Sequence, residues 1–399
     1  MADGGERQRG ERRVTDRIYL VPGFFGFTNL GELRYFTHVR EFLGAQCHAL
    51  GVDVEVHAIK SPPTASLRKR AARIAEAIAT TSRNGEGAIH LVGHSSGGLD
   101  VRLLASPGVS LPTKVDVERI AERIRTVVTV ATPHHGTPVA SFFTTLLGQR
   151  LLQLLSLTTI YVLRFGHLPI AVVLRLGAAF ARFDRHLGVN SALLDQLFGQ
   201  LLADFSSGRR QAIGRLLGEI GKDQDQMLQL APEAMDTFDA LARPRPGVRS
   251  GCVVTQARPP GVGSTLLAGL DPAAQATHAI YQALYRLASR SGATQYPPTT
   301  RPQARALVRA YGAPPTPAAN DGVVPTLSQV WGDVVHAARA DHLDVVGHFH
   351  GPEHVPPHVD WLTTGTGFSR ADFEALWADV ARYAVGVRRI ASADRRLRA

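Results

Sequence analysis

The sequence predicts an α/β protein whose mostly parallel sheet is flanked by helices on both faces. Short apolar and β-branched runs alternate with helical segments at the spacing of βαβ units. The chain has 399 residues, of which 44% are hydrophobic and 20% charged. This composition is typical of a globular protein, and it excludes wholesale disorder and collagen-like repeats. The predicted strands cover residues 17–21, 51–59, 88–92, 125–130 and 252–255.

Helical segments are predicted between these strands and after them. Two prolines, Pro62 and Pro63, open one of these segments, as prolines often do at a helix start. The stretch 295–319 is rich in Pro, Thr and Ala and is typical of a long loop. The predicted helices cover residues 33–43, 64–82, 96–105 and 370–385.

The alternation of strands and helices stops after Pro138. Residues 141–230 are rich in leucine and have helical spacing, and residues 151–163 contain no charge. Arg164 interrupts this run before the roughly 20 apolar residues that a membrane span needs. We therefore predict a helical cap at 141–247, either a mobile lid or a buried subdomain, inserted into a core formed by 17–140 and 248–387.

The charge is unevenly distributed. The chain has 44 Lys and Arg against 34 Asp and Glu, a net charge of +10. The densest basic runs lie at the two ends and contain few aromatic residues, which favours solvated tails at 1–16 and 388–399 over a nucleic-acid surface. No nucleic-acid partner is expected, whereas transient contact with an anionic membrane or lipid interface stays open.

Cysteine content and the N-terminus bear on the cellular compartment. The two cysteines, Cys47 and Cys252, are too few for a disulfide-stapled scaffold or a multi-cysteine zinc module, and we expect two buried thiols. The first 20 residues contain no apolar stretch of the kind that a secretory signal needs. The sequence as written therefore predicts a cytoplasmic protein, and secretion by another route stays open.

The strongest chemical motif is Gly93-His94-Ser95-Ser96-Gly97, a G-x-S-x-G pentapeptide. It follows a predicted strand and precedes a predicted helix, the context in which this motif forms a sharp turn that exposes the serine hydroxyl. The small residues let neighbouring backbones approach, and the N–H of Ser96 would face a developing oxyanion. The motif predicts Ser95 as a nucleophile.

A serine nucleophile needs a general base, and the base needs an orienting carboxylate. In hydrolases with this motif the chain order is Ser, then Asp or Glu, then His. Asp321 lies in a polar Asn-Asp-Gly turn, and His342 follows 21 residues later. Ser95, Asp321 and His342 are therefore the candidate triad.

Five segments together resemble the bacterial triacylglycerol lipases of the Pseudomonas/Burkholderia type, true-lipase family I of the α/β-hydrolase superfamily. They occur in the family's order and cover about a third of the chain. The cap and the stretch 272–319 lie outside the resemblance. The segments are VPGFFGFTNLGELRYF at 21–36, GHSSGG at 93–98, VATPHHGTPVA at 130–140, NDGVVP at 320–325 and DHLDVV at 341–346.

The resemblance implies an α/β-hydrolase fold with a helical cap, and it implies roles for individual residues. Ser95 matches the family's nucleophile, Asp321 the triad acid and His342 the base, while the N–H groups of Phe24 and Ser96 match the oxyanion donors. Pro22 is a departure, because the family usually has histidine there. Three other histidines near the motifs do not follow the acid in the sequence and are expected to have packing or supporting roles; they are His94, His134 and His135.

The resemblance also implies a structural calcium ion that braces the loop carrying the histidine. Asp344 matches one of its carboxylates, and Asp271 resembles the other, although its distance from Asp321 in the sequence is longer than in the family. Calcium takes six to eight oxygen ligands, and only these two carboxylates are evident. A zinc site drawn from the later histidines has no matching spacing, so solvated loop histidines are expected at His348, His350, His354 and His358.

The sequence thus predicts a serine ester hydrolase that acts on lipid-like esters with hydrophobic acyl chains, with no cofactor required for the chemistry. A phospholipase, thioesterase or acyltransferase would use the same residues, and fold and triad do not separate these activities. The non-enzymatic alternative is a lipid-binding module with a retired active site.

Overall fold

The computed structural model describes most of the chain. The described residues are 15–24, 35–62, 64–82, 87–165, 169–184, 191–222, 225–261, 264, 271–290 and 296–386. Both predicted tails fall almost wholly outside these ranges. Arg17 lies in the first strand, as predicted, and its buried side chain pairs with Glu55.

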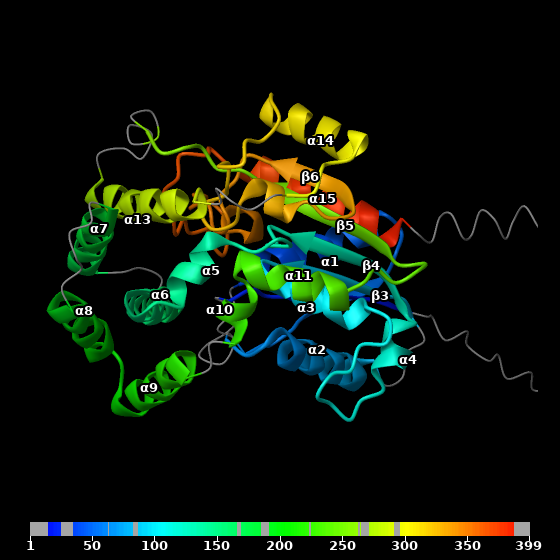
Figure 1. Cartoon of the computed structure of the whole chain (residues 1–399), viewed down its shortest axis with the longest axis horizontal. Helices are drawn as coiled ribbons and strands as arrows, with labels where there is room; N and C mark the ends of the chain where they lie inside the picture. Colours follow the sequence, from blue (N-terminus) through cyan, green and yellow to red (C-terminus); the bar gives the residue numbers. More distant parts are fainter. Residues whose placement is uncertain are drawn as a thin grey trace, which may run out of the picture.

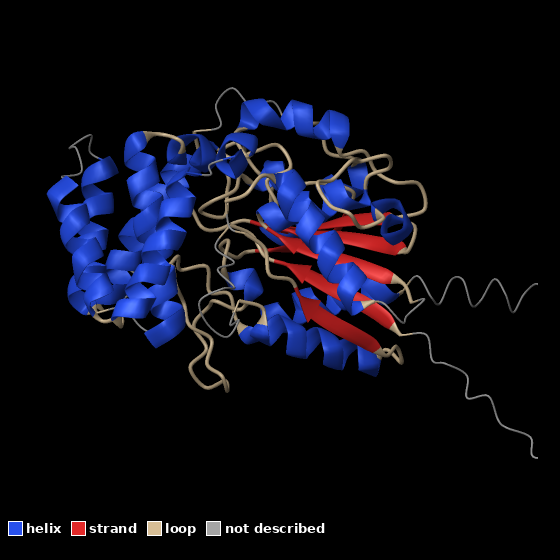
Figure 2. Ribbon diagram, turned by 90° about the horizontal axis from the view of Figure 1, so that it is seen from below, coloured by secondary structure: helices blue, strands red, loops and turns tan. Residues whose placement is uncertain are grey.

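A six-stranded sheet forms the centre of the molecule, and every neighbouring pair of strands is parallel. The strand order is β2-β1-β3-β4-β5-β6, and the arrows of the sheet run in one direction between helices (Figure 2). The strands are β1 (Asp16–Val21), β2 (Val54–Ala58), β3 (Ile89–His94), β4 (Ile124–Val130), β5 (Arg249–Thr255) and β6 (Asp333–Ala338). Residues of β1 and β3 are buried throughout, as expected for central strands covered on both faces.

Helices pack on both faces of this sheet (Figure 1). On one face, α2 and α3 join the apolar cluster that includes Leu91 and Val127; on the other, α1 and α15 join the cluster that includes Ile18 and Val128. The helices of the core are α1 (Thr37–Ala49), α2 (Leu67–Thr81), α3 (Ser96–Ala105), α4 (Val117–Ala121), α14 (Arg301–Tyr311) and α15 (Arg370–Val385). With the strand–turn–helix around Ser95, this is the predicted α/β-hydrolase fold.

A helical insertion lies between β4 and β5 and extends away from the sheet (Figures 1 and 2). Helix α7 packs closely against α13 (Pro272–Ala288), since a Cβ added at Gly177 would lie 2.8 Å from the Cα of Ala276. The insertion contains α5 (Pro138–Phe143), α6 (Leu146–Phe165), α7 (Ile170–Asp184), α8 (Ser191–Ala203), α9 (Ser207–Lys222), α10 (Asp225–Gln229) and α11 (Met235–Leu241). None of the described helices is long and apolar enough to cross a membrane.

Two local expectations differ from the structure, and one strand was not predicted. The helix predicted at 33–43 is observed as α1 at Thr37–Ala49, with its predicted start outside the described residues. The stretch predicted as a loop contains α14, which begins with a capping box between Thr300 and Gln303 and ends at left-handed Gly312. Strand β6 was not predicted at all, because its residues are only half-buried at the sheet edge and alternate weakly.

Candidate active site

The nucleophile candidate occupies a sharp turn between β3 and α3. Ser95 has φ 55° and ψ −133°, a conformation that residues with a side chain rarely adopt and that is found mostly at functional sites. Its neighbours in β3 and α3 are buried, whereas Ser95 itself is only partly buried. The turn therefore presents the hydroxyl at the carboxyl end of the central strand.

Glycines make this turn possible. A Cβ added at Gly93 would lie 2.3 Å from the carbonyl oxygen of Gly97, and a Cβ at Gly97 would lie 2.4 Å from the carbonyl oxygen of Val21. Both contacts are far shorter than real side chains allow, so only glycine lets α3 return so close to β3 and β1. The spacing of the motif in the sequence follows from these two contacts.

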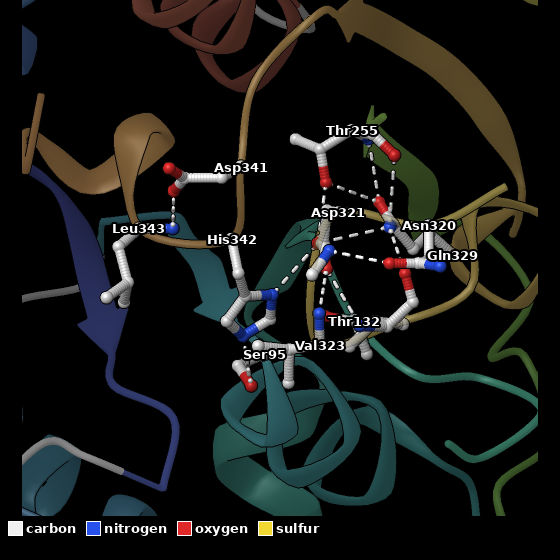
Figure 3. Close-up of polar contacts among 12 residues, drawn as sticks. Ser95, Thr132, Thr255, Asn320, Asp321, Val323, Gln329, Asp341, His342 and Leu343 are labelled. Atoms are coloured by element: carbon white, nitrogen blue, oxygen red, sulfur yellow. Dashed lines mark hydrogen bonds and ion pairs between the residues drawn. The ribbon is translucent and has the colours of Figure 1, made fainter. Parts of the chain in front are cut away.

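The candidate acid and base come from the loops before and after β6, and their side chains meet Ser95 (Figure 3). His342 Nε2 lies 2.9 Å from Ser95 Oγ, and His342 Nδ1 lies 2.9 Å from Asp321 Oδ2. Because a carboxylate only accepts, Nδ1 carries the proton and Nε2 is left to accept from the serine. The structure thus brings the three candidates together in the hydrogen-bonded order that nucleophilic catalysis requires.

The carboxylate of Asp321 is buried and held by several donors. Its Oδ1 accepts from the backbone N–H of Val323 at 2.9 Å and of Val324 at 2.7 Å. Its Oδ2 accepts from the hydroxyl of Thr255 at 2.8 Å and from the amide of Gln329 at 3.2 Å, in addition to His342. These contacts fix the orientation of the acid, and the Asn-Asp-Gly turn supplies the two backbone donors.

A second polar chain links the base to the start of the first loop. His94 Nε2 lies 2.8 Å from the carbonyl oxygen of His342, and His94 Nδ1 lies 2.6 Å from the hydroxyl of Tyr35. A carbonyl only accepts, so His94 donates through Nε2 and accepts from Tyr35 through Nδ1. Burial lowers the pKa of His94 well below its usual value, so the ring is neutral. The hydroxyl of Tyr35 also hydrogen-bonds the backbone of Gly23.

The first loop lies directly against the nucleophile. In the register of the sheet, Val21 of β1 pairs with Gly93 of β3, so the loop after β1 and the turn after β3 are neighbours. A Cβ added at Gly23 would lie 2.5 Å from the Cβ of Ser95. Phe24 is buried next to Gly23, and Ser96 is the first residue of α3. Both predicted oxyanion donors therefore lie close to Ser95.

A buried ion pair is hydrogen-bonded to the loop that follows β1. Arg70 of α2 and Asp100 of α3 have fully buried side chains whose charged atoms lie 2.7 Å apart. Arg70 also donates to the carbonyl oxygen of Pro22 at 2.8 Å and to that of Pro62 at 2.5 Å. The carbonyl of Pro22 therefore anchors the loop through Arg70. Pro22, which replaces the family's histidine, lies one residue before Gly23, and Gly23 is the residue that contacts Ser95.

The other two histidines near the motifs are not part of the hydrogen-bonded triad. His134 is fully buried between Thr129 and Arg102, and its ring stacks on Trp331. Burial lowers its pKa well below the usual value. His135 is half-buried and faces Asp239 at 3.8 Å. Both positions agree with packing roles.

The two aspartates considered for calcium have different partners. Asp271 is exposed, and its carboxylate caps the start of α13 by accepting from the N–H of Ala274. Asp344 is buried and accepts from the N–H of Asp341 and the hydroxyl of Thr366, both at 2.9 Å. Burial raises the pKa of Asp344, which favours its neutral form. None of these contacts joins the two aspartates, and neither belongs to the metal-capable group that the described residues form. The calcium site stays a prediction.

Sequence reasoning missed the supporting residues Tyr35, Arg70, Asp100, Thr255 and Gln329. Each acts through contacts with residues far away in the sequence. Only Tyr35 lay within a segment that carried the resemblance.

No protein-family model and no curated protein matches the chain. Among solved structures, the metagenomic carboxyl esterase MGS0156 is 18% identical, with 93% of this chain and 76% of that chain covered and a TM-score of 0.48. Lipase 1 from Pelosinus fermentans is 16% identical, with coverages of 92% and 99% and a TM-score of 0.47. The Staphylococcus hyicus lipase is 14% identical, with coverages of 94% and 97% and a TM-score of 0.47.

Proposed function

We propose that this protein is a serine ester hydrolase that acts on lipid-like esters with hydrophobic acyl chains. The observation that carries the proposal is the hydrogen-bonded series Ser95–His342–Asp321 at the carboxyl end of the sheet, with both distances 2.9 Å. A partly accessible serine, a base in the accepting tautomer and a fixed buried carboxylate are the three parts that acyl transfer needs.

In the proposed reaction, His342 Nε2 takes the proton of Ser95 as Oγ attacks the ester carbonyl carbon. The N–H groups of Phe24 and Ser96 stabilise the resulting oxyanion. His342 then gives the proton to the departing alcohol, which leaves an acyl group on Ser95. Water, deprotonated by His342, releases the acid and restores the serine. No step requires a metal or an organic cofactor.

The preference for hydrophobic acyl chains is supported by the surroundings of the site. Phe24, beside Ser95, belongs to the same apolar cluster as Val139 and Phe143 of α5 and the buried leucines of α6. Helix α5 starts next to the acid, since the hydroxyl of Thr137 donates to the carbonyl oxygen of Val323. Apolar walls with a few fixed polar groups are typical of sites for hydrophobic ligands. The closer kinship with Pseudomonas/Burkholderia lipases stays a prediction.

Fluorophosphonate labelling followed by kinetics tests the proposal. We expect the probe to label the wild type and the Ser207→Ala control, whose serine is exposed in α9, and not to label Ser95→Ala. Ser95→Ala should lower kcat/KM for a medium-chain ester by at least about 10³-fold, and Asp321→Asn or His342→Ala added to it should lower it little further. Labelling at another serine, or Ser95→Ala retaining half of the wild-type kcat/KM, would overturn the proposal.

The substrate class is tested with the same enzyme preparation. Parallel assays on triacylglycerol, phospholipid and acyl-thioester, each with and without an added acceptor alcohol, separate lipase, phospholipase, thioesterase and acyltransferase activities. We expect the carboxylic ester with apolar chains to have the highest kcat/KM and water to be the main acyl acceptor. Absence of turnover on all of them, together with lipid binding, would favour the retired module.

A further inference from the structure

Three histidines meet next to the segment that follows His342. His38 comes from the first turn of α1, and His354 and His358 come from the segment that follows the candidate base. One ring nitrogen from each lies within 4.8 Å of the others, and they are the only metal-capable group of three or more among the described residues. The expectation of solvated loop histidines is wrong for His348 and His358, which are buried with 7% and 4% of their surface exposed.

The backbone of this segment explains why the rings converge. Gly351 and His358 form an antiparallel bridge, with the N–H of His358 donating to the carbonyl oxygen of Gly351 at 2.9 Å. His354 lies within the turn that this bridge closes, so it is carried to the same side as His358. The ring of His38 lies 3.7 Å from that of His358 and 5.1 Å from that of His354, centroid to centroid.

The hydrogen bonds of the rings leave one nitrogen of each histidine available. His358 Nδ1 donates to the carbonyl oxygen of Gly347 at 2.8 Å, and His354 Nδ1 donates to that of Pro356 at 3.0 Å. In both rings the lone pair is therefore on Nε2. His38 Nδ1 is buried and has no hydrogen-bond partner among the residues that the structure describes. Metal-ligating histidines typically donate their second N–H to a backbone carbonyl in this way, which fixes the tautomer and the ring orientation.

We propose that His38, His354 and His358 bind a single zinc-class divalent cation. Three neutral imidazoles suit zinc, cobalt or nickel, and they do not suit calcium or magnesium, which prefer oxygen ligands. Zinc–nitrogen bonds of about 2.0–2.1 Å in a tetrahedron place ligand nitrogens about 3.3 Å apart. The ring nitrogens lie within 4.8 Å of one another. Binding a zinc ion would therefore shorten the distance between any two of them by at most roughly 1.5 Å. His38 and His354 are partly exposed, so solvent can supply the fourth ligand.

The three histidines lie where helix α1 meets the segment after His342, so a bound ion would have a structural role. Gly347, whose carbonyl oxygen is bonded to His358, is five residues after His342, and a Cβ added to it would lie 3.2 Å from the ring of His38. A bound ion would fasten the start of α1 to the loop that carries the base. The site lies outside the hydrogen-bonded triad, so the proposal stands or fails independently of the hydrolase activity.

Metal binding to the untagged, chelator-treated full-length chain tests the site. We expect zinc titrated in a calorimeter to bind at one ion per chain, and cobalt(II) to give the intense visible absorption of a tetrahedral nitrogen-rich site. His38→Ala and His354→Ala should each weaken zinc binding by at least about 100-fold and abolish the cobalt absorption. The matched control is His350→Ala, because His350 is exposed in the same loop and lies outside the group.

Circular dichroism of each variant establishes that it is folded before its affinity is compared. If His38→Ala fails to fold, His354→Ala decides the matter, because His354 is partly exposed and lies in a loop. The proposal is overturned if the wild type shows no saturable binding at one zinc per chain. It is equally overturned if folded His354→Ala binds zinc as tightly as the wild type, or if His350→Ala loses as much affinity as His354→Ala.

Discussion

The buried pair of Arg70 and Asp100 connects stability to the geometry of the loop before Phe24. Replacing Arg70 by Met keeps the apolar stem and removes the charge. The change leaves the fully buried carboxylate of Asp100, together with the carbonyl oxygens of Pro22 and Pro62, without the guanidinium. Burial already raises the pKa of Asp100 to about 6 despite Arg70. Removing one partner of a buried ion pair costs about 3–5 kcal/mol, and we expect Arg70→Met to lose that much unfolding free energy at pH 7.

Urea melts and ester kinetics on two variants check this reasoning. Arg70→Met/Asp100→Leu removes both charges, so it should recover at least about 2 kcal/mol of the loss. Neither variant holds the Pro22 carbonyl, so both should lower kcat for a soluble ester by about 10²-fold, the effect of losing an oxyanion donor. A loss below about 1 kcal/mol for Arg70→Met would refute the stability argument. Wild-type kcat in the double variant would refute the link to the first loop.

Four further predictions concern other parts of the chain. Tyr35→Phe should lower kcat about tenfold with little change in KM, because it leaves the buried Nδ1 of His94 without its hydrogen-bond donor, at a cost of about 1–3 kcal/mol. An altered KM with unchanged kcat would contradict a positioning role. The neutral, buried His134 gains a proton when the chain unfolds below about pH 6.5, so its contribution to stability falls as the pH is lowered. In urea melts between pH 6.5 and 4.5, the unfolding free energy of His134→Gln should therefore change with pH less steeply than that of the wild type, by about 1.4 kcal/mol per pH unit. Equal slopes would disprove this. The cap residues Leu146 and Ile170 are 84% and 54% exposed, so they present apolar surface that a lipid interface would cover. Replacing both by Asp should lower hydrolysis of an aggregated long-chain ester at least about tenfold and leave hydrolysis of a soluble short-chain ester unchanged. Equal effects on both substrates would argue against contact of the cap with a lipid interface. Thermal melts should shift to higher temperature with calcium than with EGTA if Asp344 binds the predicted ion, and Asp344→Ala should abolish the difference; melts of the wild type that coincide would refute the calcium hypothesis.

The motifs in the sequence and the resemblance that they carry were sufficient to name Ser95, Asp321 and His342 as candidates, and the structure brings their side chains together. The tight turn around Ser95 depends on glycines within the motif itself, and the two backbone donors to Asp321 come from the same turn. The strand predictions succeeded for β1, β3 and β4 because these strands are buried throughout or nearly so and therefore appear as continuous apolar runs. The chain order of the triad then followed from the fold.

Other features could be decided only by tertiary structure, because they join residues that have no relation in the sequence. Arg70 reaches Pro22 across 48 residues, and His94 reaches the backbone of His342 across 248. His38 gave no signal of its own, and it meets His354 and His358 because α1 packs beside the loop after the base. An isolated histidine or arginine has the same local propensity wherever it lies, and only the burial and partners that folding gives it determine its chemistry.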